Sequence, residues 1–167
     1  GAAARRDEGG VIGMGIAVRK AGLDEFELLM EWRMRVLREV FSLNDGADLG
    51  ELRAANEAYY REHLADGTHV ACFATDEESG RVVGCGGICY QREMPSPDNA
   101  DGTCGYLMNV FVAPDERGRG IGRKVVEFLF CDARARNTGK IYLESSAIAK
   151  PLYLSIGFKD MPDYMKL

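Results

Sequence analysis

A turn rich in glycine and arginine is the part of the sequence best suited to chemistry. It reads RGRGIG over residues 117–122 and joins an apolar stretch at 106–112 to an amphipathic one. Glycine lets backbone N–H groups come close to a ligand, and a helix N-terminus adds unpaired N–H donors and partial positive charge. With Arg117, Arg119 and Arg123 nearby, the turn predicts a phosphate site. The glycines could instead do no more than end a strand.

Two other phosphate-binding motifs are excluded by their spacing. A P-loop requires Gly-Lys-Ser/Thr at a fixed distance after its first glycine, but Arg123 and Lys124 stand where Gly118 would require the Gly-Lys pair. A dinucleotide-binding fingerprint, G-x-G-x-x-G, begins at Gly118 and Gly120 but has Arg123 in place of the third glycine. The turn therefore matches neither of these motifs.

The turn and a segment downstream of it together resemble the GNAT superfamily of N-acetyltransferases. The family signature, Gln/Arg-x-x-Gly-x-Gly/Ala after a strand, matches residues 117–122. A second family segment, A-x-x-L-Y-x-x-x-G-F, matches residues 149–158, with Ala149, Tyr153 and Gly157 in place. The two segments have the separation usual in the family. The resemblance spans residues 15–167 and is weak outside 106–158.

The resemblance implies acetyl-coenzyme A as a cosubstrate and assigns residues to it. The pyrophosphate would lie on the N–H groups of the turn, and the pantetheine arm would run beside strand 106–112, where that strand splays from strand 141–145. Ser146 stands where many members of the family carry an asparagine with longer reach. The cofactor residues implied in this way are Val110, Phe111, Val112, Arg117, Gly118, Arg119, Gly120, Ile121, Gly122, Arg123 and Ser146.

The resemblance also implies a direct attack of the acceptor amine on the thioester. A backbone N–H at Asn109 or Val110 would polarise the thioester carbonyl. Tyr153 would act as the acid, because a phenol of pKa about 10 can protonate a thiolate whose conjugate acid has a pKa of about 8.5. By spacing alone, Tyr153 is better explained as a packed aromatic side chain on a short helix.

The base that accepts the amine proton is not identified by the sequence. Glu31, Glu93 and Glu144 are candidates, but each is better explained as a solvated charge. His69 begins a predicted strand, where a lone histidine is usually structural. Deprotonation through water is therefore the expectation.

The composition limits the class of protein. Asp and Glu number 26 against 21 Lys and Arg, giving a formal charge of −5, and this balance lacks the basic surplus typical of a nucleic-acid partner. No apolar run approaches the roughly 18 residues of a membrane span. The 5 cysteines include no CxxC pair and there are 2 histidines, so no metal is expected. The odd cysteine count and the lack of a secretory signal favour a reducing, cytoplasmic compartment.

The hydrophobic pattern predicts an α/β (α+β) fold. Residues 1–14 are expected to be a flexible leader and residues 15–167 a single domain. Asp24 with Glu27, and Asp48 with Glu51, are expected to cap two helices. The expected strands cover 16–19, 69–75, 81–90, 106–112, 141–145 and 164–167, and the expected helices cover 24–41, 49–65, 121–138 and 151–156. This order predicts a mixed, largely antiparallel sheet flanked by helices, which is the fold the GNAT resemblance implies.

The acceptor side is expected at the two N-terminal helices and the loop 94–102. Trp32, Arg33, Arg35, Tyr59 and Tyr60 lie in those helices but do not identify the acceptor. The expected function is acetyl transfer to a primary amine of a small molecule or a protein, and the resemblance leaves a homodimer open. The alternatives are a non-catalytic acyl-coenzyme A sensor and an adaptor domain that binds no coenzyme A.

Overall fold

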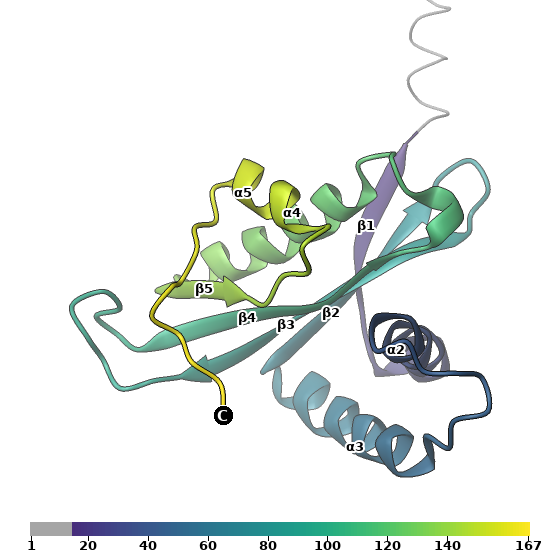
Figure 1. The fold of residues 1–167 in the computed structure, drawn as a ribbon, viewed down its shortest axis with the longest axis horizontal. Coiled ribbons are helices and arrows are strands. Elements are labelled where there is room, and N and C mark those ends of the chain that lie inside the picture. The colour runs from purple at the N-terminus through teal and green to yellow at the C-terminus, as the bar shows by residue number, and fades with distance from the viewer. Residues whose placement is uncertain (1–14) are drawn as a thin grey trace, which may run out of the picture.

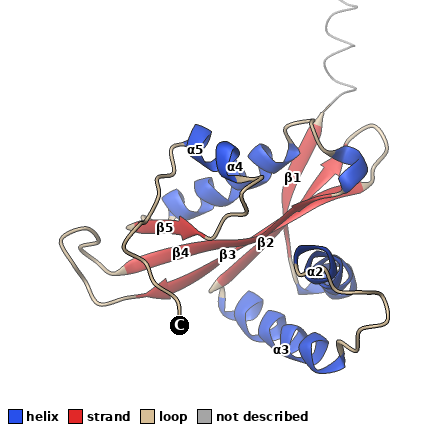
Figure 2. Ribbon diagram, in the orientation of Figure 1, coloured by secondary structure: helices blue, strands red, loops and turns tan. Residues whose placement is uncertain are grey.

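Five strands form one mixed sheet in the order β1-β2-β3-β4-β5. The computed structural model describes residues 15–167, and the predicted leader, residues 1–14, lies outside the described residues. The strands are β1 (Ile16–Ala21), β2 (His69–Asp76), β3 (Val82–Arg92), β4 (Thr103–Val112) and β5 (Lys140–Leu143). Neighbours from β1 to β4 pair antiparallel, and β4 pairs parallel with β5 (Figure 2). The predicted fold class is confirmed.

Helices cover both faces of the sheet (Figure 1). One face carries α2 (Phe26–Val40) and α3 (Gly50–Asp66), and the other carries α4 (Ile121–Ala135) and α5 (Lys150–Ile156). Two 3-10 turns, Leu23–Glu25 and Pro114–Glu116, precede α2 and α4. No helix within residues 15–167 has the length and apolar character required to cross a lipid bilayer.

The alternation of side chains along each strand divides the core into two layers. In β2, Val70 and Cys72 belong to the layer under α4, whereas Ala71 and Phe73 belong to the layer under α2. The α2 layer is centred on Trp32, whose ring meets those of Phe73 and Phe111 edge-on, with centroids 6.4 and 6.2 Å apart. Val125, Val126 and Leu129 of α4 fill the other layer and are fully buried.

Three details of the predicted elements are wrong. Asp24 does not cap α2: it lies in the 3-10 turn before that helix, and no side chain caps α2. Asp48 does not cap α3 either, because Leu49 is the N-cap residue of that helix and no side chain caps it. The predicted terminal strand at 164–167 does not form. Because β5 has only four residues, it offers a short edge for pairing. The terminal segment contacts it through side chains instead, with the Tyr164 hydroxyl against the Lys140 amine.

A pair of glycines in β3 lets the two layers approach the sheet closely. A Cβ on Gly86 would lie 2.5 Å from Val125 Cγ1 of α4. A Cβ on Gly87, which points to the opposite face, would lie 2.7 Å from His69 Nε2. Gly86 therefore makes room for α4, and Gly87 makes room for the imidazole ring at the start of β2.

His69 is buried in a small polar cluster. Its side chain is 3% exposed. Nδ1 lies 2.8 Å from the Tyr59 hydroxyl, which in turn lies 2.6 Å from Cys89 Sγ. Burial, aided by the charges of His63 and Arg33, lowers the pKa of His69 to about 4. The imidazole is therefore neutral in the folded protein at neutral pH.

Gly86→Ala should destabilise the fold. The added methyl group would press on Val125 and force α4 away from the sheet, at a cost of about 1–3 kcal/mol. Chemical denaturation measures the change in the free energy of unfolding. Gly46→Ala is the control, because its Cβ would meet nothing closer than 3.5 Å and its change should stay within about 0.5 kcal/mol. Equal stability of the Gly86 variant and the wild type would contradict this packing.

The low pKa of His69 predicts a loss of stability in mild acid. The unfolded histidine takes up a proton below pH about 6.5, whereas the folded one does so only near pH 4. The stabilising contribution is thus present above pH 6.5 and is lost as the pH falls toward 4, by about 2 kcal/mol between pH 7 and 5. Denaturation at each pH should show this loss in the wild type and a flatter profile in His69→Gln. Parallel profiles would contradict the assignment.

Candidate active site

Strand β4 leaves its parallel neighbour half-way along its length. The ladder with β5 runs from Cys104–Lys140 to Leu107–Leu143 and ends there. β4 continues to Val112 while still paired with β3. From Met108 onward, the side of β4 that faced β5 therefore has no strand partner among the described residues. The splay implied by the family resemblance is present in the structure.

A β-bulge marks the point where the strands part. The register between β3 and β4 shifts between Cys85 and Gly87, so that Asn109 and Val110 both face Gly86. Asn109 has a φ of 58°, a left-handed conformation that asparagine tolerates better than most residues. The bulge disrupts the regular ladder at the place where the family resemblance implies a carbonyl-polarising N–H donor.

The side chain of Asn109 is held from α2. Arg33 Nη1 donates a hydrogen bond to Asn109 Oδ1 at 2.9 Å, and Arg33 Nε donates to Asn56 Oδ1 of α3 at 2.8 Å. The amide of Asn109 is therefore engaged within the protein, and the backbone of the bulge is what remains for a ligand. Nothing in the sequence linked Arg33 to Asn109, because 76 residues separate them.

The glycine-rich turn forms an open helix N-terminus at the end of β4. Gly118 and Gly120 have φ values of 83° and 74°, and no atom lies within 4 Å of a Cβ built on either. Gly120 is the N-cap residue of α4, no side chain caps the helix, and its first turn contains no acidic residue. The first N–H groups of α4 are thus free of side-chain acceptors, as an anion site requires.

The three arginines near the turn differ in how completely nearby carboxylates compensate their positive charges. Arg119 is paired with Asp76, at 2.9 Å, and with Glu116, so its charge is already balanced. Arg117 stacks on Phe111 and has a more distant carboxylate, Glu39, at 3.9 Å.

Arg123 has a looser set of partners. It donates to Ser155 of α5 at 2.6 Å and lies 3.4 Å from Glu127. Arg117 and Arg123 are therefore better placed than Arg119 to bind an added anion, a ranking that could not be predicted from the sequence.

Tyr153 presents its hydroxyl to a large cavity. The residue is 9% exposed, its ring packs edge-on against Phe158, and its hydroxyl has no hydrogen-bond partner among the described residues. Burial raises the pKa of this phenol, so it is protonated at neutral pH. Tyr153 is thus both a packed aromatic side chain, as the simpler interpretation held, and a free donor.

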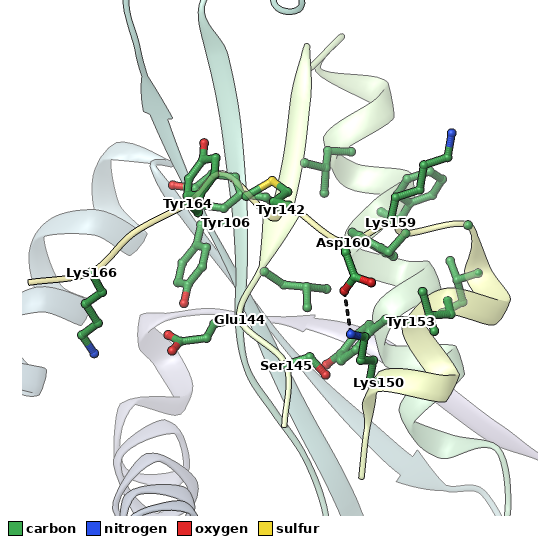
Figure 3. Close-up of a pocket in the computed structure, with 18 of the residues that line it drawn as sticks. Tyr106, Tyr142, Glu144, Ser145, Lys150, Tyr153, Lys159, Asp160, Tyr164 and Lys166 are labelled. Carbon is green, nitrogen blue, oxygen red and sulfur yellow. Dashed lines mark ion pairs between the residues drawn. The ribbon is translucent and has the colours of Figure 1, made fainter. Parts of the chain in front are cut away.

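Figure 3 shows residues that line a cavity beside Tyr153. The cavity has a volume of about 920 Å³. It extends around β5 and under the terminal segment. Tyr106, Glu144 and Ser145 lie on its strand side, and the Lys150–Asp160 ion pair, at 2.6 Å, lies on its helix side. The glycine-rich turn at 117–122 does not line this cavity. It meets α5 separately, because Gly122 would place a Cβ 3.4 Å from Leu152.

Ser146 is used in the turn that leads into α5. Its Oγ accepts a hydrogen bond from the Ala149 N–H at 3.2 Å, and its carbonyl accepts one from the Lys150 N–H at 3.1 Å. The hydroxyl expected to contact the cofactor thus already orders the backbone before α5.

The candidates for the general base lie in different parts of the structure and do not form one cluster. Glu93 pairs with Lys140 at 3.2 Å, and Glu31 is exposed on α2. Glu144 faces Tyr106 in the large cavity, where burial first and this carboxylate second raise the pKa of the Tyr106 phenol (Figure 3). His69 lines a different cavity. No group of three or more metal-binding side chains occurs within residues 15–167.

A second cavity, of about 260 Å³, lies where α2 and α3 meet the bulge. Its walls come from both helices and from β2, β3 and β4. They are formed by Arg33, Ala55, Asn56, Tyr59, Tyr60, His69, Cys89, Met108 and Asn109. The sequence placed the acceptor side at these helices but did not single out Cys89 or Met108. On β4 the two cavities are neighbours, because Tyr106 lines the first and Met108 the second.

Curated relatives of the chain include amine acetyltransferases. A glucosamine 6-phosphate N-acetyltransferase of Trypanosoma brucei brucei is 28% identical over 125 residues, which cover 75% of this chain and 81% of that protein. An IAA acetyltransferase of Azospirillum brasilense is 35% identical over 91 residues, covering 53% of this chain and 54% of that protein.

Solved structures share the fold. A predicted acetyltransferase of Clostridium acetobutylicum, crystallised with acetyl-CoA, has a TM-score of 0.80 and 26% identity, and the match covers 92% of this chain and 96% of that one. A GCN5-related N-acetyltransferase of Ralstonia eutropha has a TM-score of 0.76 and 24% identity over 92% of this chain and 98% of that one. The model of the acetyltransferase (GNAT) family matches residues 26–158, and the chain belongs to that family.

Proposed function

We propose that this protein transfers the acetyl group of acetyl-coenzyme A to a primary amine of a small molecule or peptide, in a ternary complex. The observation that carries the proposal is the gap that opens after Leu107, with the bulge at Asn109 beside it. Such a gap offers backbone partners to a chain of amides, and the open N-terminus of α4 lies at the end of the same strand. Acetyl-coenzyme A has both amides and a pyrophosphate.

This arrangement supports a proposed set of cofactor contacts. The first N–H groups of α4 and the turn at 117–122 would bind the pyrophosphate, with Arg117 and Arg123 adding charge. Val110, Phe111 and Val112 would bind the pantetheine arm along the free side of β4. Arg119 supports the turn through Asp76 instead of binding the phosphates. Ser146 acts indirectly, by ordering the start of α5.

The chemistry uses the two ends of this gap. The acceptor amine attacks the thioester carbon, and the developing oxyanion is stabilised by a backbone N–H of the bulge at Asn109 or Val110. The carbon–sulfur bond then breaks, and Tyr153, kept protonated by burial, donates its proton to the leaving thiolate. The amine gives up its proton to water, because no carboxylate lines the cavity next to the bulge, and water returns a proton to the Tyr153 phenolate.

That same lack of a carboxylate favours a second candidate function. A non-catalytic sensor of acyl-coenzyme A would keep the gap and the open helix N-terminus but need no base. Turnover separates the two functions, because a sensor would bind acetyl-coenzyme A and acetylate no amine. Glucosamine 6-phosphate belongs first in the amine panel, since it gives several of the relatives their name.

We further propose a reducing, cytoplasmic setting for this activity. The cysteines of the described chain are all free thiols, and Cys72, Cys85 and Cys104 are buried in the core. Burial raises the pKa of the Cys85 thiol to about 12, so that this group is unreactive.

Gly120→Glu should weaken the binding of acetyl-coenzyme A. A carboxylate at the N-terminus of α4 would repel the pyrophosphate and occupy its place, and we expect a rise in the dissociation constant of about 10- to 100-fold. Calorimetric titration measures it. Gly80→Glu is the matched control, because Gly80 has a similar φ of 72° and an equally open surrounding in the turn before β3. Equal affinities of the two variants would contradict the proposed pyrophosphate site.

Tyr153→Phe should lower kcat by about 100-fold or more while leaving the affinity for acetyl-coenzyme A unchanged. The change removes the proton donor but keeps the ring that packs on Phe158. Steady-state kinetics and calorimetry supply the two values. Tyr90→Phe is the control. It also removes a phenol hydroxyl, one that lies outside the gap and donates a hydrogen bond to Asp132 at 2.5 Å. Full kcat in the Tyr153 variant would exclude this residue as the acid.

A further inference from the structure

The second cavity is lined by one cationic side chain and by no acidic one. Arg33 is that cation, and Asp and Glu are absent from the walls. The ion pairs formed within residues 15–167 do not include Arg33. His69 of the same cavity is neutral at pH 7, since its pKa is lowered, chiefly by burial, to about 4. The cavity therefore has a net positive charge.

The partners of Arg33 leave part of its guanidinium free. Nε and Nη1 donate to the neutral side-chain oxygens of Asn56 and Asn109, whereas Nη2 has no acceptor among the described residues. A partly buried charge with only neutral partners is incompletely compensated. The planar guanidinium is also suited to bind two oxygens of one carboxylate or phosphate group.

The charge of Arg33 acts on the neutral groups around it. Burial raises the pKa of the Tyr59 and Tyr60 phenols and of the Cys89 thiol, and the Arg33 charge acts against that rise in each case. These side chains line the cavity together with Arg33. The positive field therefore extends over the cavity as a whole.

We propose that this cavity binds the acceptor through an oxyanion, a phosphate or a carboxylate, carried on the same small molecule as the amine. The inference rests on the proposed acetyl transfer, because it places the acceptor beside the bulge at Asn109. The oxyanion pairs with the free side of Arg33, and the amine is directed toward the gap between β4 and β5. The nearby cation also disfavours the ammonium form of the amine and so favours the neutral nucleophile.

Arg33 also has a structural use, and the experiment must separate the two. It joins α2 to α3 through Asn56 and to the bulge of β4 through Asn109. A residue that served only as this clamp would, when changed, affect every acceptor alike. Selectivity for an oxyanion would be unaffected.

Changes at Asn56 isolate the charge. Asn56→Asp keeps an oxygen for Arg33 Nε, loses the Nδ2 donor to the Leu52 carbonyl, and places a carboxylate against the guanidinium. Asn56→Ala removes both hydrogen bonds without adding charge. Arg38→Gln is the control for net charge: Arg38 lies on the same helix outside the cavity and donates to the Asn44 carbonyl at 2.9 Å.

Matched amines supply the probes. Glucosamine 6-phosphate is compared with glucosamine, and an α-amino acid is compared with its amide, so that the two arms test phosphate and carboxylate separately. Each probe is titrated calorimetrically into protein saturated with coenzyme A, and kcat/KM is measured with acetyl-coenzyme A. The binding measurement does not depend on turnover.

The proposal expects the charged member of at least one pair to bind better than its neutral partner. Asn56→Asp should weaken the binding of the charged member by about 10- to 100-fold and the binding of the neutral member by less than about threefold. Asn56→Ala and Arg38→Gln should keep the preference. Three outcomes would overturn the proposed oxyanion site: equal binding within both pairs, no binding of any probe, or a preference for the charged member that Asn56→Asp leaves unchanged. Selective binding without acetylation of any amine would instead support an oxyanion site at Arg33 and refute the proposed acetyl transfer.

Discussion

The candidate active site of this protein depends on the separation of β4 from β5. Parallel pairing requires both strands to keep one direction, and the bulge at Asn109 turns β4 away just after the ladder ends at Leu107. A left-handed residue at this point is strained unless its surroundings hold it, and Arg33 holds it from α2. The result is a stretch of extended backbone that keeps its partner on one side and is open to a ligand on the other.

The packing of the two faces brings the remaining groups to this gap. Gly86 lets α4 lie close against the sheet, so its N-terminus is fixed at the end of β4. On the same face α5 places Tyr153 against Phe158, and on the other α2 and α3 close the cavity around Arg33. The proposed thioester and amine would therefore reach the bulge from opposite faces of the sheet. This separation suits direct attack in a ternary complex.

Local spacing in the sequence was sufficient to predict the sheet, the glycine-rich turn and Tyr153 on a short helix. Contacts between distant segments could not be predicted in the same way. Arg119 is neutralised by Asp76, 43 residues earlier, and Arg33 reaches Asn109 across 76 residues, with no local signal for either pairing. The expected terminal strand failed because its pairing depends on the length of β5, which the residues at 164–167 do not determine. His69, set aside as structural, is buried and also lines the cavity on which the further inference rests.

Amide NMR of the ¹⁵N-labelled protein during a titration with acetyl-coenzyme A tests the central claim most directly. We predict saturable shifts of the backbone N–H signals of Val110–Val112 and of Gly118–Gly122, with a stoichiometry of one acetyl-coenzyme A per chain. Asn109 or Val110 should also differ between acetyl-coenzyme A and free coenzyme A, because only the former carries the carbonyl. Shifts confined to the cavity under the terminal segment, or no shifts at β4 and the turn, would contradict a cofactor site in the gap.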